Sequence, residues 1–459
     1  MELIPLLLFA LICLALMGGY PVAFTLAGTS LLFAGVGLLT DTFDMAFLNA
    51  MPNRIYGTMT NANLFAVPMF VFMGIMLEKS RIAESLLTGM ARLFGTMRGG
   101  LGISVILVGM LLAASTGIVG ATVVTMGVLS LPTMLKAGYS PALASGTICA
   151  TGTLGQIIPP SIALVLLGDV MSNAYQQAQL SAGVFSTQTV SVGDLFTGAI
   201  IPGLLLVACY LLYMVLVARF RPASAPAAKA SDLALLDDEQ SLAKSLVLGL
   251  LPPLLLIMAV MGSIISGAAT PTEAAGVGAV GSVLLALVKR KLSLHILREV
   301  SEATTRVTSM VFLILIGASI FSLVFRGFGG DIVVEDFFRG LPGGVVMATI
   351  MVMLVVFLLG FILDFIEITY MVVPIVGPVL LAMGLDPIWL GVMLAVNLQT
   401  SFLTPPFGFA LFYLRGAASD QLTTRDMYRG VVPYIVIQLI VLGLLALWPQ
   451  LATWLPSHL

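Results

Sequence analysis

Charged residues are scarce in this chain. Lysine, arginine, aspartate and glutamate make up 9% of its 459 residues, whereas hydrophobic residues make up 59%. Soluble domains carry about 25% charged residues, so this composition excludes an ordinary soluble protein. The sequence also contains no basic patch large enough to bind nucleic acid. We therefore exclude nucleic acid as a partner and expect the lipid bilayer to surround the chain.

Cysteine and histidine are nearly absent as well. Cys13, Cys149 and Cys209 each lie in an apolar run without CxxC spacing, so we expect small buried hydrophobic residues and no disulfide. The two histidines, His295 and His458, cannot form a metal cluster or a proton relay. Nucleophile–base pairs and the glycine-rich loop of an ATP motor are also missing. We expect neither an enzyme nor an ATPase, and no organic cofactor.

Long apolar stretches dominate what remains, and many could cross a hydrocarbon layer of about 30 Å. In the first half they cover residues 3–17, 22–38 and 62–78, the pair 101–114 and 120–135, then 141–168 and 195–218. In the second half they cover 246–264, 269–288 and 308–325, the pair 345–360 and 367–383, then 388–414 and 430–448. The first stretch lacks the positive start of a secretory signal and is expected to remain as a spanning helix. These stretches predict an all-α polytopic membrane protein.

The two halves of the sequence are related to each other. A shift of 246 residues aligns prolines and glycines of one half with those of the other: Pro132 with Pro378, Gly138 with Gly384, Pro141 with Pro387 and Pro159-Pro160 with Pro405-Pro406. Asp194–Gly198 also matches Asp426–Gly430 if an insertion near 170–188 is allowed. We predict two repeats, 1–218 and 246–459. They are joined over 219–245 by a polar linker that contains a short surface helix.

The orientation of the halves depends on the paired stretches. If each pair forms a re-entrant hairpin, each half has five crossings and the halves are inverted. This arrangement leaves only Arg54, Arg326 and Arg339 on one side and puts the other 17 of the 20 basic residues opposite. Basic residues collect on the cytoplasmic side of membrane proteins. We therefore predict a cytoplasmic linker, with both termini and the insertion facing outward.

Polar interruptions occur at matching places in the two halves. Inverted repeats with broken helices are typical of secondary transporters, which bind their cargo near the membrane midplane. The interruptions lie at 115–120 and 151–155 before Pro159-Pro160, and at 360–364 and 397–401 before Pro405-Pro406. Prolines free upstream carbonyls, and carbonyls with hydroxyls are hard oxygen ligands for a cation such as Na⁺. A following half-helix presents its N-terminus to an anionic substrate. The alternative is that these residues only kink helices, but two hydroxyl-rich breaks at matched positions favour a site.

A few charged residues lie within or beside the apolar stretches. A carboxylate inside a membrane is costly unless it serves an ion or a pair, so Asp364 is expected to belong to an ion site. Glu367 is expected to be solvated in the cavity, and Glu273 to close a helix start through Thr270 or Thr272. The remaining charges are expected on surfaces: Lys136 and Asp169 at the membrane interface, and Asp237–Glu239 on the linker helix.

Several motifs together resemble one known family. They are the segments Gly19–Gly28, Gly155-Gln-Ile-Ile-Pro-Pro-Ser161, Ala269-Thr-Pro-Thr-Glu-Ala274, Gly360-Phe-Ile-Leu-Asp364 and Leu403-Thr-Pro-Pro-Phe-Gly408. Over essentially its full length the chain resembles the large membrane subunit, the DctM-type permease, of a tripartite ATP-independent periplasmic (TRAP) transporter. The resemblance implies an elevator-type transporter of the bacterial inner membrane. It also implies two sodium sites, a small four-helix membrane partner and a periplasmic binding protein that delivers a small organic acid.

The resemblance also implies particular site residues. Its first sodium site falls on Ser115 and Thr116 with the backbone of Gly155, Ile158 and Pro160. Its second falls on Gly360, Asp364, Ser401 and Thr404. The substrate is expected near Gly117, Thr153, Asn397 and Pro405. The glutamines of the insertion, Gln176, Gln177 and Gln179, are candidate contacts for the binding protein.

Three other readings stay open from the sequence. The nearest is a stand-alone sodium-coupled organic anion symporter of related architecture, which would need no partner proteins. An intramembrane enzyme is disfavoured by the missing catalytic groups. A channel would be excluded by uphill, sodium-dependent accumulation.

Overall fold

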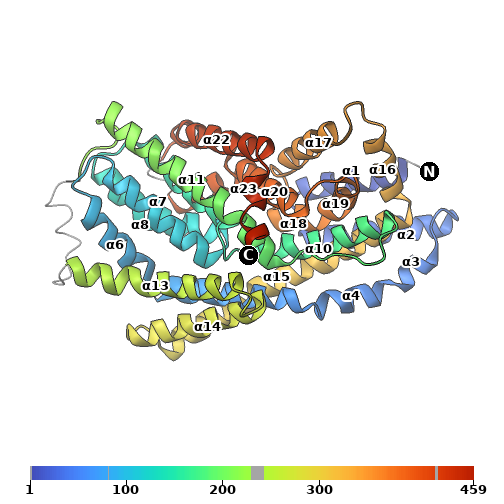
Figure 1. The fold of residues 1–459 in the computed structure, drawn as a ribbon, viewed down its shortest axis with the longest axis horizontal. Coiled ribbons are helices and arrows are strands. Elements are labelled where there is room, and N and C mark those ends of the chain that lie inside the picture. The colour runs from blue at the N-terminus through green and yellow to red at the C-terminus, as the bar shows by residue number, and fades with distance from the viewer. Residues whose placement is uncertain (1–2, 81, 229–241, 419–421) are drawn as a thin grey trace.

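The computed structural model describes residues 3–80, 82–228, 242–418 and 422–459 (Figure 1). The first half contains α1 Leu3–Met17, α2 Val22–Leu39, α3 Met45–Asn49, α4 Met51–Met59, η1 Ala62–Phe65, α5 Ala66–Lys79, α6 Ile82–Phe94, α7 Gly100–Thr116, α8 Val119–Lys136, α9 Pro141–Thr153, η2 Leu154–Gln156, α10 Ile162–Ser181 and α11 Val192–Phe220. The second half contains α13 Leu242–Ile265, α14 Pro271–Val288, α15 Leu294–Gly327, α16 Gly330–Arg339, α17 Gly344–Leu359, α18 Phe365–Met371, α19 Val373–Ala382, α20 Pro387–Leu403, α21 Phe409–Ala417, α22 Thr424–Leu447, α23 Gln450–Thr453 and η3 Pro456–His458. These residues contain helices and no strands, which confirms the all-α prediction.

The helices are long and apolar enough for a membrane protein that crosses the bilayer several times. Seven of them could span a bilayer, or eight if α18 and α19, which are bent by 56°, count as one. Their outward surfaces are apolar: on α14, Val280, Leu284 and Leu287 are each more than half exposed. Such a surface is unfavourable in water and suits lipid. In Figure 1, α13 and α14 lie side by side along one edge of the molecule.

Helix starts follow local capping chemistry. The Ser191 hydroxyl accepts from the Asp194 N–H, while Asp194 Oδ2 accepts from the Ser191 N–H at 2.8 Å. Thr270 and Glu273 form the same capping box at the start of α14. The structural role predicted for Glu273 is therefore confirmed. Each box satisfies backbone donors that a helix start leaves without partners.

Several contacts between the two halves have counterparts in which the equivalent helices have changed places. α2 packs on α15 and α14 on α5; α8 packs on α21 and α19 on α10. A Cβ at Gly430 of α22 would lie 1.9 Å from the Ala142 carbonyl oxygen of α9, and one at Gly198 of α11 would lie 2.5 Å from Ile388 of α20. Ala142 and Ile388 are 246 residues apart, and Gly198 aligns with Gly430 in the repeat. Two related halves would produce this pattern. The repeat, its boundaries and the opposite orientation of the halves stay predictions.

The helices differ from expectation in the insertion, in α15 and in several short helices. The insertion near 170–188 is largely helical, because α10 continues to Ser181, whereas its counterpart α21 has nine residues. α15 begins at Leu294 and is one helix of 34 residues, about 50 Å long at 1.5 Å per residue, so it extends beyond the hydrocarbon layer. The short helices α4, α6 and α16 are not expected from the apolar stretches, because they are too short or too polar for spans. The predicted surface helix of the linker, with Asp237–Glu239, lies outside the described residues.

We expect opposite accessibility for two exposed serines. Ser186 follows the α10 extension, and Ser301 lies in the N-terminal part of α15. Because of the basic-residue bias, a cysteine at Ser301 should react with a membrane-impermeant maleimide only from the cytoplasm, and one at Ser186 only from outside. Labelling is measured in intact cells and in inverted vesicles, with the native three-cysteine chain as background. Reaction of both positions from the same side would contradict the inverted-repeat topology.

Candidate functional site

The double prolines separate helices in both halves. η2 ends at Gln156 and α10 begins at Ile162, while α20 ends at Leu403 and α21 begins at Phe409. The peptide between the two prolines is cis in each case. The expected breaks at 151–155 and 397–401 are wrong, because the first segment belongs to α9 and η2 and the second to the last turns of α20. The breaks follow at 157–161 and 404–408, where the prolines cannot donate to upstream carbonyls.

The first predicted sodium site surrounds the C-terminus of α7. The Ser115 and Thr116 hydroxyls both donate to the Leu112 carbonyl, at 2.9 and 3.0 Å. The Thr116 and Thr122 hydroxyl oxygens lie 2.7 Å apart. A hydroxyl that donates its hydrogen still has lone pairs that can face a cation. The two side chains are therefore already turned to one backbone carbonyl at the helix end.

The C-terminal end of α7 packs closely on the backbone of the first double-proline segment. A Cβ at Gly155 would lie 3.3 Å from the Ala113 carbonyl oxygen, and one at Gly117 would lie 2.9 Å from the Ile162 nitrogen. The structure thus packs Gly155 against the last turn of α7, the turn that ends with Ser115 and Thr116. Ile158 and Pro160 follow in the same connection. Next to them, Ser161 donates its hydroxyl to the Gly155 carbonyl at 2.8 Å.

The second predicted site lies between α17, α18 and α20. Gly360, at the end of α17, packs closely on Ser401, since a Cβ at Gly360 would lie 2.1 Å from the Ser401 hydroxyl oxygen. The Ser401 hydroxyl donates to the Leu398 carbonyl at 2.8 Å. Thr404 directly follows α20, and its hydroxyl donates to the carbonyl of Thr400 in the last turn of the helix at 2.7 Å. The structure therefore joins Gly360 to Ser401, with Thr404 one turn further along.

Asp364 caps the start of α18. Its Oδ1 accepts from the Phe365 N–H at 2.7 Å, and Glu367 Oε2 accepts from the Asp364 N–H at 3.0 Å. Glu367 is only 7% exposed, so the expectation that it is solvated is wrong. α10 and α15 pack on α18, and the bond from the Asp364 N–H gives the buried Glu367 carboxylate a partner at the helix start.

Tips from both halves line one small cavity. Its volume is ≈ 170 Å³, and its walls include Gly117–Gly120 after α7 and Asp364–Ile366 at the start of α18. Gln156 of the first double-proline segment also lines it, and its Oε1 atom is buried without a hydrogen-bond partner among the described residues. α15 closes another wall with Val307, Met310 and Val311. The cavity therefore joins two helix ends that are almost 250 residues apart in sequence.

The residues expected near the substrate do not line one common cavity. Gly117 lines the small cavity, but Thr153, Asn397 and Pro405 line neither cavity described here. Asn397 donates to the Met353 carbonyl at 2.8 Å. The Thr153 hydroxyl accepts from Gln399 Nε2 at 3.3 Å. Thr153 and Gln399 are equivalent positions under the 246-residue shift, so an axis relating the halves would pass beside them.

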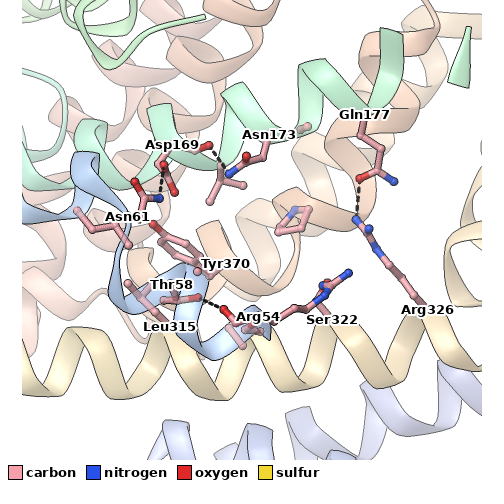
Figure 2. A pocket seen from close by; sticks show the side chains of 17 residues that line it. Arg54, Thr58, Asn61, Asp169, Asn173, Gln177, Leu315, Ser322, Arg326 and Tyr370 are labelled. Atoms are coloured by element: carbon pink, nitrogen blue, oxygen red, sulfur yellow. Dashed lines mark hydrogen bonds between the residues drawn. The ribbon is translucent and has the colours of Figure 1, made fainter. Parts of the chain in front are cut away.

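A larger cavity of ≈ 480 Å³ was missed by the sequence analysis (Figure 2). It lies between α4, η1, α10, α15 and the α18–α19 segment, and its polar lining includes Arg54, Asn61, Asp169, Asn173, Gln177, Arg326 and Tyr370. Asp169 was expected at the membrane interface, but it is only 6% exposed. Its carboxylate accepts from Asn61 at 2.8 Å and Asn63 at 3.4 Å. The signal in the sequence was an aspartate directly after the apolar run 162–168.

Comparisons with known proteins agree with the motifs. The family described as "Tripartite ATP-independent periplasmic transporter, DctM component" matches residues 8–451. The C4-dicarboxylate TRAP transporter large permease protein DctM of Pseudomonas aeruginosa is 30% identical over 407 residues, covering 88% of this chain and 89% of that protein. The sialic acid TRAP transporter large permease protein SiaM of Vibrio cholerae is 29% identical, covering 96% of both.

A solved structure shares the fold at low sequence identity. The YdaH transporter of Alcanivorax borkumensis has a TM-score of 0.61 and 15% identity, with 98% of this chain and 99% of that chain covered. The family match and the relatives cover nearly the whole chain. The chain therefore belongs to the DctM-component family, the large permease subunits of tripartite ATP-independent periplasmic transporters.

Proposed function

We propose that this permease uses a sodium gradient to import a small organic acid across the bacterial inner membrane. One observation carries the proposal: a helix tip from each half lines the same ≈ 170 Å³ cavity. Transporters built from repeats bind their cargo where broken helices of the two halves meet. The meeting of the tips supports a cargo site at this place.

Sodium is supported by the oxygen groups around the tips. Ser115, Thr116 and Ser401 turn hydroxyls to backbone carbonyls at helix ends. Hydroxyl and carbonyl oxygens are hard ligands that suit a small cation, and Asp364 adds a carboxylate at the second tip. In a medium of low dielectric constant, a bound cation would neutralise that carboxylate and reduce its repulsion of an anionic substrate. This linkage would couple the two bound species. Movement of the loaded helices relative to the rest, the elevator step, would then expose them on the other side.

An organic acid is supported by the relatives and by charge. The two relatives above are named for C4-dicarboxylates and for sialic acid, and both classes carry carboxylates. The larger cavity adds two arginines, Arg54 and Arg326, on the side predicted to face outward. Arginine is well suited to bind carboxylates because its planar fork can donate two parallel hydrogen bonds.

The transport complex would contain two further proteins, a small four-helix membrane subunit and a periplasmic substrate-binding protein. The family description names a tripartite transporter, which supports this assembly. Consistent with it, the described residues include no separate soluble domain that could capture substrate.

We expect the permease alone to transport little or nothing. Purified protein is reconstituted in liposomes with an inward sodium gradient, first alone and then with the small subunit and the binding protein. Substrate uptake should require all three proteins and sodium outside. The control replaces sodium by potassium at the same ionic strength. Robust sodium-driven uptake by the permease alone would instead favour the stand-alone symporter.

A further inference from the structure

Two arginines from separate helices converge in the larger cavity. Arg54 comes from α4 and Arg326 from α15, and Figure 2 shows both side chains reaching into the same space. Both are half-buried. Burial first, and then the charge of Arg326, lower the pKa of Arg54, which lies outside the candidate spans. Arginine nonetheless keeps its proton at neutral pH, so the cavity holds two like charges.

Neither arginine has an ionic partner in the described part of the chain. The ion pairs found there involve other residues. Arg326 donates to the neutral Gln177 Oε1 at 2.7 Å, and Asp331 attracts it without forming an ion pair. Asp169, the carboxylate of this cavity, accepts from Asn61 and Asn63 instead. Within the described residues, the positive charge of the two arginines is therefore not taken up by an ion pair.

We propose that Arg54 and Arg326 together bind the carboxylate of a small organic acid. Half-buried like charges repel each other, and an anion between them removes that repulsion. Each guanidinium can donate a pair of parallel hydrogen bonds to a carboxylate. This inference rests on the proposed function, because it assigns the anionic group of the substrate to a particular place.

The rest of the cavity suits the remainder of such a molecule. A volume of ≈ 480 Å³ lies within the range of about 300–1,000 Å³ typical of small-molecule sites. The Tyr370 hydroxyl lines the wall and is buried without a hydrogen-bond partner among the described residues. Ser322 adds another hydroxyl to the same lining. These groups can bond to hydroxyl or carbonyl oxygens of the ligand.

The α10 extension gives only the first half of the chain the residues that build this wall of the cavity. Asn173 and Gln177 lie on the turns of α10 beyond the predicted repeat, and α21 ends after nine residues without equivalents. Gln177 also holds Arg326 in place. The insertion thus builds a wall of the cavity, and Gln177 lines it. Contact of Gln176, Gln177 and Gln179 with a binding protein stays a prediction. On the predicted topology the site opens outward, so a carboxylate would meet it before the cavity between the tips.

Arginine modification tests the proposal without knowledge of the natural substrate. The purified full-length permease is treated with phenylglyoxal in sodium-free buffer, with acetate, succinate or neutral acetamide, at constant ionic strength maintained with chloride. Mass spectrometry of peptides gives the modification rates of Arg54, Arg326 and Arg339. Arg339 is the matched control, because it is exposed, lies on the same predicted side and pairs with Glu335.

Acetate or succinate should slow modification of Arg54 and Arg326 at least about fivefold, and acetamide should not. Arg339 should react at the same rate throughout. In Arg54→Gln the carboxylate concentration that half-protects Arg326 should rise about tenfold, equivalent to about 1.4 kcal/mol. Arg339→Gln should leave it unchanged. If Arg54→Gln does not fold, Arg54→Lys keeps the charge without the planar fork and should still weaken protection.

Equal modification rates with carboxylate and acetamide would overturn the proposal, as would equal protection of Arg339. These outcomes are separable from failure of the proposed function. Protection is measured without sodium and without partners, so it does not depend on sodium-driven uptake. A complex that transports while its Arg54 and Arg326 show no protection would retain the function and lose this site.

Discussion

Asp364→Asn should raise the sodium concentration that half-saturates uptake by tenfold or more, while the permease stays folded and inserted. At 4 Å and an effective dielectric constant of about 20, two unit charges interact by about 4 kcal/mol. Asparagine keeps the size and one oxygen ligand of the carboxylate but loses this charge. A loss of about 1.4 kcal/mol would already weaken sodium binding tenfold.

The capping bonds of Asp364 provide the competing explanation. Its carboxylate accepts from the Phe365 N–H, and asparagine caps helices about as well as aspartate. A purely structural Asp364 would therefore tolerate the substitution. Sodium dependence of initial uptake, measured in the reconstituted three-protein complex, separates the two roles.

Asp386→Asn is the matched control for this experiment. Asp386 is exposed and caps α20 in the same half, accepting from the Trp389 N–H at 2.8 Å. The same chemical change there should leave sodium half-saturation unaltered. If Asp364→Asn behaves like this control, Asp364 is not a sodium ligand, and only hydroxyls and carbonyls remain as candidate ligands.

Gly430→Ala should destabilise the permease by about 2 kcal/mol. An added Cβ would lie 1.9 Å from the Ala142 carbonyl oxygen and 3.0 Å from the Gly146 nitrogen, both backbone atoms of α9. Backbone cannot rotate away, so α9 and α22 must separate. Overpacking costs about 1–3 kcal/mol, and we expect the upper end. Alanine regains about 1 kcal/mol of helix propensity relative to glycine.

Gly443→Ala on the same helix is the control. Gly443 is exposed, and an added Cβ there would have no atom within 4 Å. This variant should be neutral or slightly stabilised, because only the helix propensity changes. Thermal unfolding in detergent, followed by size-exclusion chromatography, measures both variants. Equal melting temperatures for Gly430→Ala and the parent would show that the α9–α22 contact is looser than described here.

The sequence alone determined the class of protein and most of its helices. Runs of apolar residues fix where helices cross a bilayer, because lipid cannot satisfy free backbone groups. Pro159-Pro160 and Pro405-Pro406 fixed the two breaks for an equally local reason, the missing N–H groups. The capping role of Glu273 also followed from residues three apart. These features depend on neighbours in the chain, and therefore a single sequence reveals them.

Only the tertiary structure decided where polar side chains from distant segments meet. Asn61 contacts Asp169 across 108 residues, and Arg326 contacts Gln177 across 149. Sequence periodicity does not reveal such pairs. The sequence therefore predicts Asp169 at the membrane interface and distinguishes Arg54 only as one of three basic residues on the outer side. Likewise, Glu367 is buried because α10 and α15, distant in sequence, pack on α18. The larger cavity exists because α4, α10 and α15 pack around it, and that packing depends on contacts between helices rather than on any single segment.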